Sequence, residues 1–260
     1  DASYQLDANN SIGANFGFLR NPKQTWNGDM SSLILQDGDL SESSDSHADF
    51  FWQKNNLSSN IYYVGKIGKL SIDFNTDWLW SKEYQNDVTK EQYQEVGMNA
   101  QSQTAHSLTN KDYHLLASKL VLSYPLLGGN LSLGGEYSNT HRTSKYQVVP
   151  TNLVADDDSR ITESMTSSFL TYSRDFGDLS LEAGLRYEYI DFNYYEYGKY
   201  VPEQSKSYGN WFQSLSLSIP VGKVQMQLSY AADINRPSYH NLRSGIQYDN
   251  RYTYETGNPF

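Results

Sequence analysis

The sequence predicts an all-β protein, and within that class an antiparallel, up-and-down transmembrane β-barrel of about ten strands. Three observations lead to this prediction. Apolar and polar residues alternate over many segments, which is the two-residue period of a β-strand. The composition favours strands and turns, with 22 Tyr and 18 Gly among 260 residues. Short turns alternate along the chain with long polar stretches, as they do in outer-membrane barrels.

Residues 70–80 show the alternation most clearly. One parity is apolar and aromatic, and it consists of Leu70, Ile72, Phe74, Trp78 and Trp80. The other parity is polar, and it consists of Ser71, Asp73, Asn75 and Asp77. Successive side chains of a strand point to opposite faces, so one face of this strand is oily and the other carries two carboxylates. Its length is close to the roughly 9–11 residues that a tilted strand needs to cross a bilayer.

The strands are connected alternately by short turns and by long loops. Short turns are expected at residues 7–10, 65–68, 125–129, 176–178 and 220–222, and five such turns imply ten strands. The long loops are expected at about 21–54, 81–112, 141–158, 194–209 and 235–260. In a meander all of these loops emerge at one end, which is the asymmetry of an outer-membrane barrel. We therefore interpret residues 1–260 as one barrel domain, and as a partial one.

A soluble β-sandwich would show the same alternation, so other residues must distinguish the two folds. Trp78, Trp80, Tyr187 and Tyr189 lie at the loop-side ends of strands, where an interfacial aromatic girdle would lie. The polar parity carries charges that suit a wet lumen better than a dry core. The residues predicted to face that lumen are Asp73, Asp77, Glu136, Glu182, Arg186 and Glu188.

Composition and motifs exclude several classes of function. The net charge of −10 disfavours a nucleic-acid partner, because no basic patch is available to neutralise phosphates. Hydrophobic residues make up 38% of the chain, and no apolar run approaches the length of a transmembrane helix. Hydrolase, zinc-protease and phosphate-loop motifs are missing from the sequence. We expect no enzymatic activity, no cofactor and no metal site.

The C-terminal residues resemble the barrel domain of TonB-dependent-receptor-like outer membrane proteins of the Bacteroidetes type. The most specific part is an Arg-Pro-Ser-Tyr segment followed by a Gly-Asn-Pro. The matching positions are Arg236, Pro237, Ser238, Tyr239, Leu242, Tyr254, Gly257, Asn258 and Pro259. Residues 183–188 resemble a Gly-Leu-Arg-Tyr-Glu strand of the same family, whereas Gln213 stands where that family has Pro. Arg236 and Pro237 are interpreted as structural residues that turn the chain out of a strand at the barrel rim.

The resemblance implies a protein of the bacterial outer membrane whose parent imports a scarce nutrient, such as a metal chelate or a glycan. Such transporters have about 22 strands around a plugged lumen, so ten strands would be a middle portion of the barrel. The implied partners are outer-membrane lipid, an unknown small-molecule or glycan ligand and, only in the full-length parent, an energy-coupling protein. The alternative is a ligand-binding or adhesion module, either a small autonomous barrel or a soluble sandwich, that recognises its ligand through the long loops.

Aromatic residues in one loop are candidates for ligand contact, because their rings could stack on a sugar or on a chelate ring. They are Tyr194, Tyr195, Tyr197, Tyr200 and Tyr208, together with Trp211. The alternative interpretation is that they belong to an extracellular aromatic belt and to packing within the loop.

Overall fold

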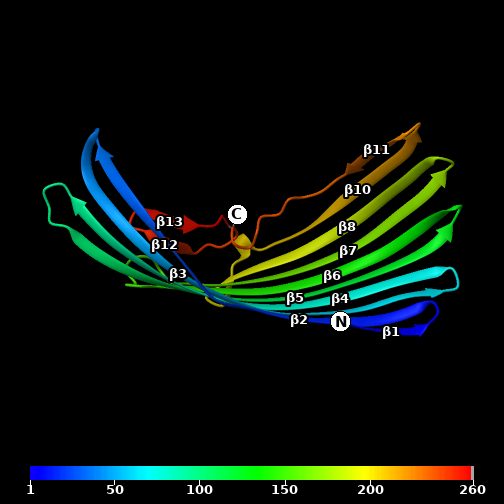
Figure 1. The fold of residues 1–260 in the computed structure, drawn as a ribbon, viewed down its shortest axis with the longest axis horizontal. Coiled ribbons are helices and arrows are strands. Elements are labelled where there is room, and N and C mark those ends of the chain that lie inside the picture. Colours follow the sequence, from blue (N-terminus) through cyan, green and yellow to red (C-terminus); the bar gives the residue numbers. More distant parts are fainter. Residues whose placement is uncertain (259–260) are drawn as a thin grey trace.

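The computed structural model describes residues 1–258, which form one long antiparallel meander and a small separate hairpin (Figure 1). The meander runs in chain order through β1 (Ala2–Asp7), β2 (Asn10–Gln36), β3 (Asp39–Ile67), β4 (Leu70–Glu95), β5 (Gln101–Leu126), β6 (Gly129–Val149), β7 (Asp157–Phe176), β8 (Leu179–Glu196), β10 (Lys206–Val221) and β11 (Val224–Ala231). The short β9 (Lys199–Tyr200) pairs with β8, and a 3₁₀ turn follows at Pro202–Gln204. The hairpin consists of β12 (Ile246–Asn250) and β13 (Thr253–Thr256). The predicted all-β meander of about ten strands is confirmed.

The sheet bends into an arch, and its two outer strands are β1 and β11 (Figure 1). Within the described residues these edges do not pair with each other, so the ten strands form an open section of wall. No helix among residues 1–258 is long and apolar enough to cross a membrane.

Tight turns join the strands at one end of the sheet. Gly68, Gly177 and Gly222 each have a positive φ there, between 61° and 65°. Leu127 and Gly128 both have positive φ, as a two-residue hairpin turn of the primed type requires. These turns match the strands' right-handed twist, and they fix the register of the pairs that they join.

The opposite end of the sheet corrects the prediction of long loops. Most of residues 21–54, 81–112 and 141–158 continue the strands, and β2 and β3 extend to a two-residue turn at Asp37–Gly38. Residues 194–209 and 235–260 also contain strand pairs, β9 with β8 and β12 with β13. Pro22 lies where the β2–β3 register shifts between Asn21 and Gln24, and there its missing N–H costs no ladder hydrogen bond. Irregular connections remain at residues 96–100 and 150–156.

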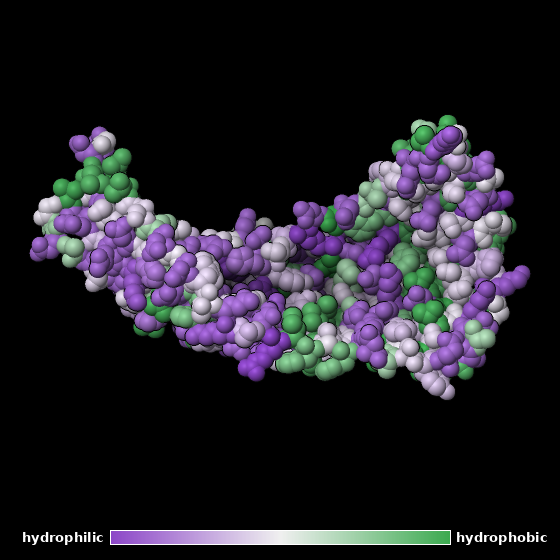
Figure 2. All heavy atoms as spheres, in the orientation of Figure 1, coloured by the Kyte–Doolittle hydropathy of each residue, from purple (hydrophilic) through white to green (hydrophobic). Residues whose placement is uncertain are grey.

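The two faces of the sheet differ in polarity. The convex face carries exposed apolar side chains, among them Phe16, Phe74, Leu120, Leu133, Leu185 and Leu215. In the space-filling view, hydrophilic residues predominate along the middle of the arch (Figure 2). The buried side chains lie on the concave side, beneath residues 232–258, which we call the C-terminal strap. The strap leaves β11 and crosses the hollow of the arch towards β4 (Figure 1).

Candidate functional site

The concave face is the candidate site, because strand alternation directs most of the predicted functional charges to it. The pairing from β4 to β8 runs without a register shift, so each strand keeps one parity on this face. Asp73 and Asp77 on β4, Glu136 on β6, and Glu182, Arg186 and Glu188 on β8 all belong to that parity. That this face lines the lumen of a closed barrel stays a prediction.

Near the short turns the concave face holds an acidic hollow of about 390 Å³. Its charged lining residues are Asp73, Asp77, Glu136 and Lys119. Lys119 lies directly opposite Glu136 in the register, and its ammonium group is also 5.5 Å from the ring centre of Phe169. Three carboxylates and one ammonium therefore share an open, wet space.

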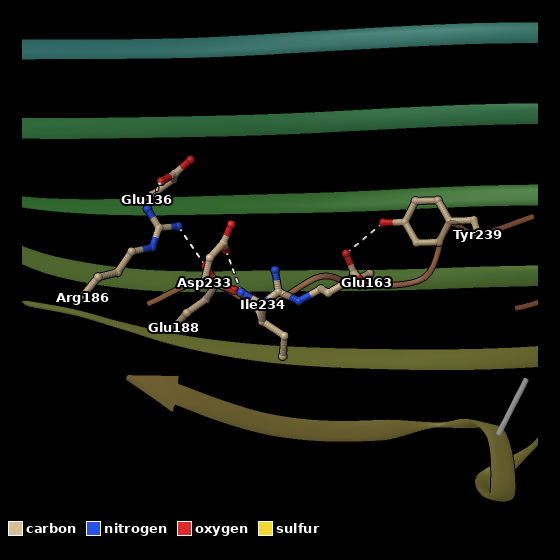
Figure 3. Close-up of polar contacts among 8 residues, drawn as sticks. Glu136, Glu163, Arg186, Glu188, Asp233, Ile234 and Tyr239 are labelled. Atoms are coloured by element: carbon tan, nitrogen blue, oxygen red, sulfur yellow. Dashed lines mark hydrogen bonds and ion pairs between the residues drawn. The ribbon is translucent and has the colours of Figure 1, made fainter. Parts of the chain in front are cut away.

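A charge network continues from this hollow towards the strap (Figure 3). The Arg186 guanidinium donates to Glu136 Oε2 at 2.9 Å and to Glu188 Oε2 at 3.0 Å. Arg236 of the strap donates to the other oxygen of Glu188. Glu188 is only 5% exposed, and a carboxylate so buried is tolerated because two guanidinium groups compensate its charge. Glu182, by contrast, is exposed and makes no ion pair within residues 1–258.

The family-motif residues hold the strap to the sheet through Tyr239 and fix the strap's own fold through Gly257 and Asn258. The Tyr239 hydroxyl donates to Glu163 Oε1 at 2.8 Å, and the backbone N–H of Asn258 donates to the carbonyl of Asn241 at 2.6 Å. A Cβ on Gly257 would lie 2.5 Å from the Arg243 carbonyl oxygen, so this close approach requires glycine. Pro259 lies outside the described residues.

Arg236 and Pro237 are expected to turn the chain out of a strand at the barrel rim, but the chain leaves strand β11 before it reaches them. Strand β11 already ends at Ala231, and the chain then runs inward across the concave face. The buried Glu188 carboxylate explains this path, because it needs the Arg236 guanidinium as a partner.

Two buried clusters fill the space between the strap and the sheet. The first joins Ile161, Ile190, Phe192 and Tyr194 of β7 and β8. Tyr239 and Leu242 of the strap pack against this cluster. The second joins Ala105, Tyr146 and Val148 of β5 and β6 to Tyr248 of the strap hairpin. Apolar burial of this kind is the main favourable contribution to docking the strap.

Glu91 on β4 is the polar anchor of the strap hairpin. It is 2% exposed and accepts hydrogen bonds from the Tyr248 hydroxyl and from the backbone N–H of Arg251, the latter at 2.7 Å. Burial, followed by the adjacent Glu91 carboxylate, raises the pKa of Tyr248, so the phenol stays protonated and remains a donor. Arg251 also pairs with Glu42 at 3.0 Å and lies over the Tyr93 ring.

Several carboxyl groups around the strap are buried without a full set of partners. Burial raises the pKa of Asp87 to about 6, although Gln85 donates to it at 2.7 Å. The pKa of Asp157 is also raised, first by burial and then by the charges of Glu196 and Asp158. One carboxylate oxygen of each of these aspartates is buried without a hydrogen-bond partner. Within residues 1–258 no cluster of three or more His, Asp or Glu side chains is arranged to hold a metal ion.

The aromatic residues predicted to contact a ligand do not form one surface. Tyr194 is fully buried under the strap, where its hydroxyl lies 2.9 Å from Ser244 Oγ. Tyr208 packs against the same cluster. Tyr195 and Tyr200 contact each other with ring centres 5.6 Å apart on the convex side, and Tyr197 lies in the turn before β9. Trp211 is 59% exposed and packs on Tyr187.

The sequence reasoning missed the residues that receive the strap. Glu91 and Tyr146 lie in stretches whose polar sequence predicts loops, and Tyr248 lies in the C-terminal segment that is predicted to be a loop as well. One usable signal was present for the extension of β2 and β3, since Asp37–Gly38 is a strong hairpin sequence. Nothing in the local sequence indicates which strand the strap would reach.

Comparison with known proteins identifies a family for this chain. Residues 65–260 match the model of the Outer membrane protein beta-barrel family. Among solved structures, the alcaligin outer membrane receptor FauA from Bordetella pertussis is 13% identical, with a TM-score of 0.38 over 85% of this chain and 42% of that one. BauA, the ferric preacinetobactin receptor from Acinetobacter baumannii, is 8% identical, with a TM-score of 0.35 over 85% of this chain and 46% of that one.

The chain thus spans less than half the length of either receptor. No curated protein matches it. The family model covers well over half of the sequence, including the C-terminal motif and every strand from β4 onward. The chain therefore belongs to the Outer membrane protein beta-barrel family.

Proposed function

We propose that this section of wall belongs to a TonB-dependent-receptor-like transporter that imports a scarce nutrient, a metal chelate or a glycan, across the outer membrane. The observation that carries the proposal is the inward course of the C-terminal strap. A wall whose concave face is charged, and is crossed by a segment held through buried contacts, has the features of a lumen that is normally obstructed. An obstructed lumen admits a ligand only when the obstruction moves.

The orientation in the membrane is part of the proposal. The short turns at residues 67–70, 126–129 and 176–179 would face the periplasm, and the long β2–β3 and β4–β5 hairpins would extend outside the cell. The convex apolar side chains would contact lipid. The sequence resemblance of residues 228–260 is the basis for proposing an energy-coupling protein, a plug and a Bacteroidetes origin. The contacts described above do not bear on these three points.

Growth and uptake by cells carrying the full-length gene test the proposal. We expect the intact gene to support growth on a limiting panel of iron chelates or oligosaccharides, and we expect a protonophore to abolish uptake. A deletion of the gene should remove growth on the one substrate that is transported. Surface binding without accumulation, insensitive to the protonophore, would instead identify the ligand-binding or adhesion module.

A matched labelling experiment tests the orientation separately. Spin labels at Ile72 and Asp73 occupy neighbouring positions on opposite faces of β4. We expect an apolar quencher to reach the label at 72 and a water-soluble quencher to reach the label at 73. A label at 72 that is inaccessible to apolar quenchers would indicate a soluble sandwich.

A further inference from the structure

A second hollow on the concave face, of about 330 Å³, carries positive charge in a chain whose net charge is −10. Four basic side chains line it: Lys54 from β3, Lys111 from β5, Arg142 from β6 and His240 from the strap. Glu83 is the one acidic residue in the lining. We call the hollow that these four basic residues line the basic hollow.

Backbone pairing, rather than side-chain flexibility, brings these groups together. Lys54 lies directly opposite Glu83, and Glu83 lies directly opposite Lys111. Arg142 lies opposite Tyr113, which also lines the hollow. Neighbouring strands are only about 4.8 Å apart, so the three basic strand residues share one short section of the concave face. The arrangement is therefore a fixed property of the sheet.

Two of the four basic residues, Lys54 and Arg142, have no carboxylate partner within residues 1–258, whereas His240 lies 2.9 Å from Glu255 Oε1. Glu83 forms an ion pair with Lys111 at 2.7 Å, and this pair accounts for the one carboxylate. The Arg142 guanidinium is half-buried and makes no hydrogen bond or ion pair within the described chain. At least one ammonium and one guanidinium therefore remain uncompensated.

The strap adds further donors next to Arg142. A small pocket of about 10 Å³ adjoins the hollow and shares Lys111, Arg142 and His240 with it. Arg243 also lines this pocket, is 8% exposed and has a buried Nε without a hydrogen-bond partner. Another nitrogen of its guanidinium is 3.1 Å from Glu255 Oε1, and His240 Nε2 is 2.9 Å from the same oxygen, so Glu255 compensates these two strap residues. Lys54 and Arg142 have no such carboxylate partner within residues 1–258, and placing cations in a partly desolvated space is unfavourable unless an anion compensates them.

We propose that the basic hollow binds an oxyanion, a carboxylate or phosphate group of a ligand inside the barrel. Arg142 supplies a planar fork for two oxygens, and Lys54 supplies a point charge on the opposite side. Tyr239 and His240 of the strap line the adjoining pocket together with Arg142, so a bound oxyanion would contact the segment that obstructs the lumen. The inference deepens the proposed function by naming a ligand class, but oxyanion binding does not depend on transport.

Titration calorimetry on the full-length protein in detergent at low ionic strength tests the inference. The probes are inorganic phosphate and citrate, and glucose serves as the neutral control. We expect one or both oxyanions to bind, glucose not to bind, and the affinity to fall as the Debye length shrinks from about 30 Å to about 8 Å with added salt. The two probes distinguish a phosphate site from a carboxylate site.

Substitutions assign the binding to these residues. We expect Arg142→Gln to weaken oxyanion binding by about tenfold or more, as loss of a charged hydrogen bond predicts. The affinity of Arg142→Lys should fall between those of the wild type and Arg142→Gln. Lys54→Gln is the second variant. If Arg142→Gln does not fold, weaker oxyanion binding by Lys54→Gln tests the assignment instead. Lys82→Gln is the matched control, because Lys82 adjoins Glu83 in sequence but is exposed on the opposite face.

Two results would overturn the inference. One is no binding of either oxyanion to the folded protein at millimolar concentration. The other is an equal loss of affinity in Lys54→Gln and Lys82→Gln, which would mean general charge attraction. Retained nutrient uptake with either result would reject the oxyanion site alone, whereas oxyanion binding without any uptake would reject the transport function alone.

Discussion

The two halves of the same strands have different surroundings. In the half next to the short turns, the convex face is apolar and the concave face opens into an acidic, solvent-filled hollow. In the far half, the concave face is covered by the strap, and the buried side chains lie there. In the first half, the contrast between the two faces determines which way the side chains point. In the far half, tertiary contacts with a distant segment determine it.

The difference shows how a long strand can serve two purposes. Alternation is needed only where a strand separates an apolar medium from water. Beyond that zone the same hydrogen-bonded ladder continues without a regular alternation, and apolar residues on its concave face become a scaffold for docking another segment. The following predictions test this division, beginning with the largest expected effect.

Tyr194→Ala should destabilise the far half most. The side chain is fully buried between β8 and the strap, and truncating a buried aromatic residue costs about 3–5 kcal/mol. Urea unfolding should show this loss, and trypsin should cleave after Arg243 more rapidly. Tyr195→Ala, on the opposite face, is the control and should cost far less. Equal losses in the two variants would contradict the assignment of the core to the concave side.

Leu120→Arg should destabilise the half next to the turns by about 2–4 kcal/mol if the convex face meets the middle of a bilayer. Val121→Arg is the control, because Val121 lines the acidic hollow and a cation there would face Asp73 and Asp77. Refolding into lipid vesicles measures both. A larger loss of stability in the Val121 variant would mean that lipid contacts the concave face and not the convex face.

Glu91→Ala should release the strap hairpin while leaving the sheet paired. The change leaves the Arg251 N–H and the Tyr248 hydroxyl without their buried acceptor, which costs about 1–3 kcal/mol. Hydrogen exchange at the Arg251 amide should accelerate. Glu95→Ala, at an exposed position on the same strand, should leave that exchange rate unchanged.

Mild acid should stabilise the far half through Asp87. Its pKa is raised from 3.8 to about 6 by burial, so the folded state keeps this proton after the unfolded state has lost it. The contribution is therefore complete below about pH 4 and is lost as pH rises through 6. Unfolding experiments between about pH 4 and about pH 6 should show the free energy of unfolding decrease as pH rises. The Asp87→Asn variant should show a smaller decrease. An unchanged slope in that variant would assign the dependence to other carboxyls.

The sequence predicted the half next to the turns well and the far half poorly, for a physical reason. Residues 70–80 separate two media, so their alternation records which face each side chain occupies. Residues 81–95 face protein or water on both sides, and their polar sequence is compatible with either a loop or a strand. The pairing partner β3 decides between them, and that information is not local.

The candidate site divides in the same way. Strand parity was sufficient to group Asp73, Asp77 and Glu136 on one face. It could not reveal that Tyr194 would be buried while Tyr195 stays outside, because the strap covers only one of these two faces. The contact between Glu91 and Tyr248 joins residues separated by 157 positions, and neither residue carries a local signal of it.

The strap also has a mechanical consequence. It is anchored near β8 by Arg236 and near β4 by Tyr248, so it spans the arch as a chord spans an arc. A chord of fixed length limits how far the arc can flatten. The curvature of this wall, and with it the bore of any barrel that it helps to close, is therefore coupled to whether the strap is docked.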